Sequence, residues 1–296
     1  MDGPPLTIAI ATNDGWGSIR FAYEAVREQA ESRGAEIILV DGSHGSDPTP
    51  DELGPTTRWI DMPGSDISEM RAQAYRVARA PLIAMTEDHV QAAPDWVEQI
   101  IRAHAEHPEA AAIGGGVRNG TPQHLIDWAS FYAGHAPFMD PVPDGPAVYL
   151  SGINVSYKRE PLLAALDIVG ERAIETLINE QIKADGGVLL ADSRLVVMHF
   201  QSRGVATTAS LHYYAGRHFE GTRRSTSSDA PMRVVRSAVL PLPRGAKRLA
   251  TAVKRGQPLG RVVAAAPAML MLATAQGVGE IVGALKGPGR SATKLH

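Results

Sequence analysis

The chain has 296 residues, of which 44% are hydrophobic and 21% are charged, and its formal net charge is -3. This length is enough for one large domain with an appendage, and the composition excludes a globally disordered protein. No cysteine is present, which excludes disulfides, thiolate metal sites and cysteine nucleophiles. The first residues lack the basic and apolar pattern of a signal peptide, so the expected location is cytoplasmic.

The first 200 residues alternate short apolar strands with amphipathic helices. Residues 6–12 predict a buried strand that ends at Asn-Asp-Gly, residues 18–33 a helix, and residues 36–41 a second buried strand. Such a strand-helix-strand unit implies parallel pairing. Further expected elements are strands at 58–62, 81–86, 110–117, 148–157 and 187–200, and helices at 68–79, 95–107 and 174–184. The pattern predicts an α/β fold with a mostly parallel, Rossmann-like sheet and flanking helices.

The C-terminal part has a different composition. A Ser/Thr/Arg-rich stretch at 222–231 is typical of a linker, so we expect a catalytic domain at 1–221 and a helical region at 222–296. Eleven Lys or Arg residues lie between Arg217 and Arg261, opposed by two acidic residues. This local excess of positive charge indicates an anionic surface as a neighbour.

Residues 262–285 predict an apolar helix in which Glu280 is the only charge. A helix of about 24 residues is long enough to span a bilayer core. Pro267, three glycines, many alanines and Glu280 weaken that interpretation. A spanning helix, a helix packed on the protein and a helix at the membrane surface stay open. The third is favoured, because apolar burial and attraction of basic residues to anionic lipid act together.

Acidic residues follow three of the predicted strands. Asp14 follows the first, Asp41 the second, and the run TEDHV at 86–90 closes the strand at 81–86. In an open parallel sheet, ligands bind beyond the carboxyl ends of the strands. Neither a GxGxxG nor a Walker A sequence occurs, so dinucleotide dehydrogenases and P-loop enzymes are excluded.

If this domain binds a nucleoside diphosphate, another group must neutralise the phosphates in place of such a loop, and a divalent metal ion is the natural choice. Carboxylates and imidazoles are its common ligands. Glu87, Asp88 and His89 are expected to start such a site, and His199, at the end of a later strand, to complete it.

The order of these motifs resembles family 2 glycosyltransferases of the GT-A fold. The matching pieces cover about residues 6–205 and are TIAIATND at 7–14, EIILVDGSHGSD at 36–47, TEDHV at 86–90 with PDW at 94–96, SGINVSYKRE at 151–160, NEQI at 179–182 and VVMHF at 196–200. The resemblance implies an inverting transferase that moves a sugar from a nucleoside diphosphate to a hydroxyl. It also points to envelope polysaccharide synthesis, with an acceptor linked to lipid at the inner face of the membrane and no nucleic acid partner.

The resemblance also assigns the donor side of the site. Asp41 would hold the nucleotide base, Thr12 and Asp14 would line its pocket, and Arg71 would lie near the donor. The run 87–89 falls at the family's DxD position, which binds Mg²⁺ or Mn²⁺ and the donor pyrophosphate. This chain has Glu and His as the outer residues of that motif. Because Asp is a common turn former, Asp41, which precedes Gly-Ser, has a turn-forming role as its alternative.

On the acceptor side, the resemblance makes Glu180 the general base and places Gly152 and Asn154 near the acceptor. The alternative interpretation of Glu180 is that it is an ordinary charged residue on the surface of a helix. Trp128 has helical spacing to two other aromatics, which fits a core position or an acceptor platform. A nucleotidyltransferase is the rival enzyme, but residues 13–17 lack the basic residue that it needs. A non-catalytic scaffold of the same fold is the rival from another class.

Overall fold

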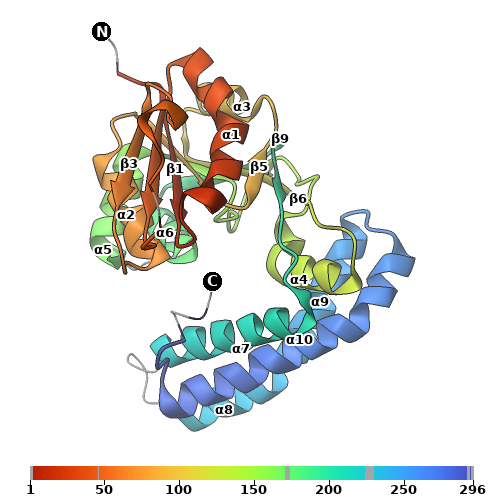
Figure 1. The fold of residues 1–296 in the computed structure, drawn as a ribbon. Helices are drawn as coiled ribbons and strands as arrows, with labels where there is room; N and C mark the ends of the chain where they lie inside the picture. The colour runs from red at the N-terminus through yellow and green to blue at the C-terminus, as the bar shows by residue number, and fades with distance from the viewer. Residues whose placement is uncertain (1–2, 46, 171–173, 224–229, 292–293, 295–296) are drawn as a thin grey trace. The chain divides into compact units, whose positions relative to one another are not determined.

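A nine-stranded sheet organises the N-terminal part of this computed structural model (Figure 1). Its strand order is β3-β2-β1-β4-β8-β6-β9-β5, and β7 pairs with β9. The strands are β1 (Leu6–Thr12), β2 (Glu36–Asp41), β3 (Thr57–Asp61), β4 (Leu82–Glu87), β5 (Val90–Ala92), β6 (Ala110–Asn119), β7 (Gly145–Pro146), β8 (Val155–Lys158) and β9 (Val188–His199). The structure describes residues 3–45, 47–170, 174–223, 230–291 and 294.

One half of the sheet is parallel, whereas the sequence predicted a mostly parallel sheet. β3, β2, β1 and β4 pair in parallel, and every residue of β1 and β2 is buried, which explains the apolar run in the middle of each strand. β8 then pairs antiparallel with β4 and with β6, so the sheet is mixed. The strand expected at 148–157 was partly wrong. It begins only at Val155, because the Asn154 amide closes a turn on the Ser151 carbonyl at 3.1 Å.

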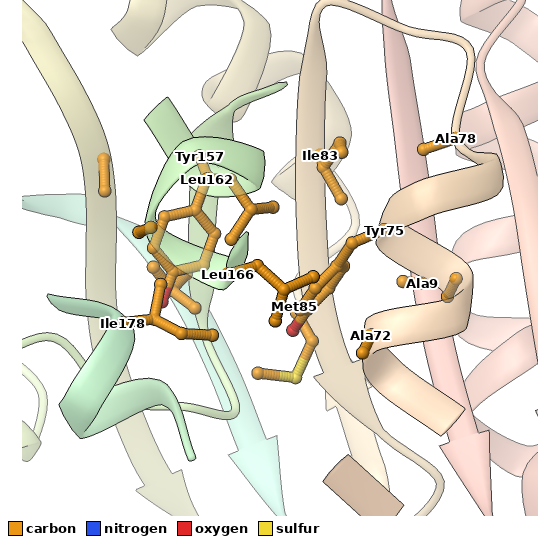
Figure 2. Packing of buried hydrophobic residues seen from close by; sticks show 14 of the residues in the cluster. Ala9, Ala72, Tyr75, Ala78, Ile83, Met85, Tyr157, Leu162, Leu166 and Ile178 are labelled. Carbon is orange, nitrogen blue, oxygen red and sulfur yellow. The ribbon is translucent and has the colours of Figure 1, made fainter. Parts of the chain in front are cut away.

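Helices cover both faces of this sheet. They are α1 (Trp16–Arg33), α2 (Ile67–Val77), α3 (Trp96–Glu106), α5 (Arg159–Val169) and α6 (Glu175–Ala184), with a short 3₁₀ turn η1 (Pro50–Glu52). Tyr75 of α2 packs between Ala9 of β1, Met85 of β4 and Leu166 of α5 in a continuous apolar cluster (Figure 2). This packing fixes α2 and α6 beside the strand ends that carry the polar residues.

A second set of helices forms its own core. It contains α4 (Leu125–His135), η2 (Ala136–Phe138), α7 (Gly204–Arg223), α8 (Ala230–Val239), α9 (Pro241–Lys254) and α10 (Leu259–Lys286). α7 and α10 run side by side (Figure 1). Their backbones approach so closely that a Cβ added at Gly279 would lie 1.9 Å from the Tyr213 carbonyl oxygen. Glycine is therefore required at this crossing.

The chain thus divides into a sheet unit, 1–118 with 140–200, and a helical unit, 119–139 with 201–296. The sequence placed the division after residue 221 instead. The structure assigns α7 to the helical unit because α7 packs along α10. Most of the linker expected at 222–231 lies outside the described residues.

Candidate active site

Three neighbouring strands end at the same edge of the sheet and carry polar residues there. Thr12 of β1 lies opposite Asp41 of β2, and Ala11 lies opposite Glu87 of β4. Gly15 has a φ of 76°, which lets the chain turn sharply from β1 into α1. The register therefore brings together the strand ends that the sequence identified, and all of them belong to the sheet unit.

Asp88 is the most heavily bonded carboxylate of this edge. It accepts hydrogen bonds from Thr12 Oγ1 at 2.6 Å and from Ser18 Oγ at 3.0 Å, and His89 Nδ1 lies 2.6 Å from its Oδ1. Burial alone would raise the pKa of Asp88, but the hydrogen bonds from His89, Thr12 and Ser18 outweigh burial and hold that pKa at about 2. Asp88 is therefore an anion that orients its neighbours.

His89 and His199 meet because of the ladder between β5 and β9. Val90 lies opposite His199, and the Phe200 amide donates to the His89 carbonyl at 2.9 Å. The two imidazole Nε2 atoms are 2.9 Å apart, and His89 Nε2 is 3.4 Å from Glu87 Oε2. Within the described residues, Glu87, His89 and His199 each offer one ligand atom, all within 4.8 Å of one another.

This donor set fits a divalent transition-metal ion. The carboxylate of Asp88 favours a proton on His89 Nδ1, and in that neutral tautomer the lone pair of His89 lies on Nε2, which faces Glu87 and His199. One carboxylate and two imidazoles suit Mn²⁺ or Zn²⁺ better than Mg²⁺, which prefers oxygen ligands. Of the four residues that the sequence offered as ligands, Asp88 alone stands outside this group of three.

Arg71 lies between two carboxylates. Its guanidinium bonds Glu87 Oε1 at 2.7 Å and Glu175 Oε1 at 2.9 Å, and Arg71 is 8% exposed. Burial works against its charge, but Glu175 and Glu87 outweigh burial and raise the pKa of Arg71. Arg71, expected near the donor, thus uses its charge to join α2, β4 and α6.

The expected base-binding residues lie at the first two strand ends. Asp41 is 2% exposed, and its carboxylate accepts from the Ser43 amide at 2.8 Å and from Ser43 Oγ at 2.7 Å. These bonds form the turn that the sequence offered as the alternative reading of Asp41. Asp14 is exposed, and its amide donates to Thr12 Oγ1 at 3.0 Å.

α6 carries two candidate carboxylates on different faces. Glu180 is exposed and accepts from the Tyr149 hydroxyl at 3.2 Å. Glu175, which the sequence reasoning missed, is buried beside Arg71, and a Cβ added at Gly152 would lie 2.9 Å from Glu175 Oε2. The helical period would have found it: Glu175 shares the face of Ile178 and Ile182, whereas Glu180 does not.

Asn154 and Trp128 make their contacts within their own units. Asn154 is fully buried, donates to the carbonyls of Gly116 and Leu195 at 2.9 and 3.0 Å, and accepts from Trp96 Nε1 at 2.8 Å, so its side-chain nitrogen and oxygen both have partners inside the sheet unit. Trp128 belongs to the helical unit. There it packs on Tyr132 and lies 4.2 Å beneath the Arg261 guanidinium.

Comparisons with known proteins agree on one family. The model described as "Glycosyl transferase family 2" matches residues 7–164, which include the strand ends of this site up to His89. The glucosyl-dolichyl phosphate glucuronosyltransferase of Haloferax volcanii is 28% identical over 106 residues, which are 32% of this chain and 34% of that protein. The match therefore spans about a third of that relative's length.

Solved structures agree on the fold. The mannosyltransferase PcManGT from Pyrobaculum calidifontis, in complex with GDP-Man and Mn²⁺, is 17% identical with a TM-score of 0.55, and the match covers 96% of this chain and 87% of that one. TarS 1–349 from S. aureus is 10% identical with a TM-score of 0.50, and the match covers 94% and 90% of the two chains. The expected GT-A fold is confirmed.

Proposed function

The chain belongs to glycosyl transferase family 2, and from this premise we propose that it transfers a sugar from a nucleoside diphosphate to an acceptor hydroxyl with inversion. The observation that carries the proposal is the convergence of Glu87, His89 and His199 at the carboxyl edge of the sheet, beside Asp88 and Thr12. A site of this kind suits a ligand with a charged diphosphate.

Glu87, His89 and His199 would hold the divalent ion. When bound, that ion supplies positive charge to the departing diphosphate. The two imidazoles favour Mn²⁺ over Mg²⁺. Asp88 fixes the ring of His89 through Nδ1. On the donor side, Asp41, Thr12 and Asp14 remain the proposed pocket for the nucleotide base.

The transfer needs one base. The acceptor oxygen bonds to the anomeric carbon as the bond from that carbon to the diphosphate oxygen breaks, and the electron pair leaves with the diphosphate. The hydroxyl proton passes to a carboxylate. We assign this role to Glu175, whose Oε1 is held by Arg71 and whose Oε2 lies over Gly152, a residue with no side chain. Glu180 is the alternative base.

The acceptor is proposed to be a hydroxyl on a lipid-linked saccharide, used at the inner face of the membrane in envelope polysaccharide synthesis. Two observations support this class. The relative from Haloferax volcanii is named for a dolichyl phosphate substrate. The chain also has a strongly basic segment between residues 217 and 261.

A donor panel tests the proposed function. UDP-, GDP- and TDP-sugars are incubated with the full chain and Mn²⁺ or Mg²⁺, and release of the nucleoside diphosphate is followed. The expected result is release from one donor class, faster with Mn²⁺ and lost in His199→Ala. Release of pyrophosphate from nucleoside triphosphates would indicate a nucleotidyltransferase instead. Failure to bind any nucleotide by calorimetry would leave the scaffold interpretation.

A further inference from the structure

Two helices of the helical unit turn aliphatic side chains to the outside. On α8 these are Met232, Val235 and Val239, with exposures of 62%, 58% and 59%. Their spacing places them on one side of the helix, opposite the buried Arg233 and Ser237. α8 is thus amphipathic, with an apolar side that none of the described residues covers.

α10, which contacts α8, has a similar outer side. Val263, Leu270 and Val278 are 62%, 54% and 48% exposed. By length and mean hydropathy α10 could cross a membrane. Its other side, however, contacts α4, α7, α8 and α9 and contains the glycine contact with α7. The helix therefore has a bundle-facing side and an outward aliphatic side, which suits a helix lying on a surface better than one crossing it.

The charges of this segment have one sign on the outside. Residues 230–286 contain a single acidic residue, Glu280, which is 2% exposed and bonded to Arg244 at 3.0 Å. The exposed charged residues of the segment are Arg236, Lys247, Lys254, Arg261 and Lys286. The outer sides of α8 and α10 together with these cations are called the basic aliphatic surface below.

The chemistry of this surface selects one class of partner. Residues 230–286 contain no Phe, Tyr or Trp. Single-stranded nucleic acids are bound on aromatic platforms, which this segment lacks. Aliphatic side chains beside lysines and arginines match the acyl boundary and the phosphates of an anionic bilayer.

We propose that the basic aliphatic surface docks the protein on an anionic lipid bilayer without spanning it. This deepens the proposed function, since the proposed acceptor is lipid-linked, but docking itself needs no catalysis. The contribution of each basic residue near the membrane corresponds to about fivefold in affinity. Insertion of the aliphatic side chains adds a contribution to the membrane affinity that salt does not screen.

Vesicle binding tests this inference with the full chain. We expect co-sedimentation with phosphatidylcholine vesicles that contain phosphatidylserine, weak binding to phosphatidylcholine alone, and partial release at high salt. The double variant Lys247→Glu and Lys254→Glu is expected to weaken binding at least about 25-fold. Val235→Ser with Leu270→Ser is expected to weaken the binding that persists in salt.

The controls change two charges and one aliphatic side chain in the sheet unit. Arg33→Glu with Arg102→Glu reverses two cations on α1 and α3, and Ile168→Ser removes an exposed aliphatic side chain of α5. Both are expected to bind vesicles as the unchanged chain does. No binding to anionic vesicles at low salt, or equal loss in the controls, overturns the inference. The inference is also overturned if the chain forms a stable dimer and the double variant Val235→Ser with Leu270→Ser dissociates it. Vesicle binding is measured without a nucleotide-sugar donor, so its outcome is independent of the outcome of the transfer assay.

Discussion

His89 and His199 are 110 residues apart in the sequence, yet their Nε2 atoms lie 2.9 Å apart. The pairing of β5 with β9 produces this approach, and the carboxylate of Asp88 sets which nitrogen of His89 faces the site. Metal affinity should therefore depend on Asp88, although Asp88 is not one of the three residues that offer ligand atoms.

Replacing Asp88 with alanine is expected to weaken Mn²⁺ binding about 10- to 100-fold, because the His89 ring loses its orienting acceptor. Titration of Mn²⁺ by electron paramagnetic resonance measures this directly. Asp14→Ala changes an exposed carboxylate at the same sheet edge and is expected to leave the affinity unchanged. Equal affinity in Asp88→Ala and the unchanged chain contradicts the assignment.

The two carboxylates of α6 are separated by matched substitutions. Glu175→Gln is expected to lower turnover about 10²- to 10⁴-fold while donor binding persists, since the proton acceptor is lost and the shape is kept. Glu180→Gln is expected to change turnover by less than about threefold, because Glu180 is exposed and accepts a hydrogen bond from the Tyr149 hydroxyl at the protein surface. Single-turnover rates and calorimetric donor affinities check both. The opposite ranking would assign the base to Glu180.

Arg71→Met is expected to lower the free energy of unfolding by about 3–5 kcal/mol, because the buried Glu175 then loses its ion-pair partner and the half-buried Glu87 loses one of its partners. Urea unfolding followed by circular dichroism measures the change. Arg76→Met, one turn further along α2, breaks an exposed pair with Asp167 and is expected to cost under about 1 kcal/mol. Similar costs in the two variants would contradict the buried bridge.

Glu36 provides a test by pH. Burial would raise its pKa, but hydrogen bonds from Thr7 and Arg79 outweigh burial and lower the pKa below its usual 4.5. A carboxylate with a lowered pKa stabilises the fold above pH 4.5 and loses that effect as pH falls through the folded-state pKa. Glu36→Gln should therefore lower the free energy of unfolding by about 1–3 kcal/mol at pH 7 and by less at pH 3. A pH-independent difference contradicts this account.

The crossing of α7 and α10 predicts a steric effect. Gly279→Ala places a methyl group against the Tyr213 carbonyl and is expected to cost about 1–3 kcal/mol in the helical unit. Gly260→Ala, on the same helix, meets nothing within 4 Å and is expected to be neutral or slightly stabilising. Thermal unfolding of both variants makes the comparison. An unchanged melting temperature for Gly279→Ala would show that the crossing can widen freely.

Local patterns predicted most of the sheet unit. β1 and β2 were found with their bounds because fully buried parallel strands are continuous apolar runs. Asp88 and His89 could be proposed from the sequence because they directly follow an apolar run and so fall at the end of a strand. Glu175 was missed because its signal is a helical face and not a motif. α5 was also missed, and the discontinuous helical unit could not be predicted, because no local pattern shows that 119–139 pack with residues beyond 200.

The interrupted helical unit has a consequence for the order in which the chain acquires its structure. During synthesis, α4 emerges well before α7 and α10, the helices it packs against, and β9 is made in between. The sheet unit can therefore complete its strands while α4 still lacks its neighbours. Shortening the chain from its C-terminus would leave α4 as an uncovered insertion within an otherwise finished sheet unit.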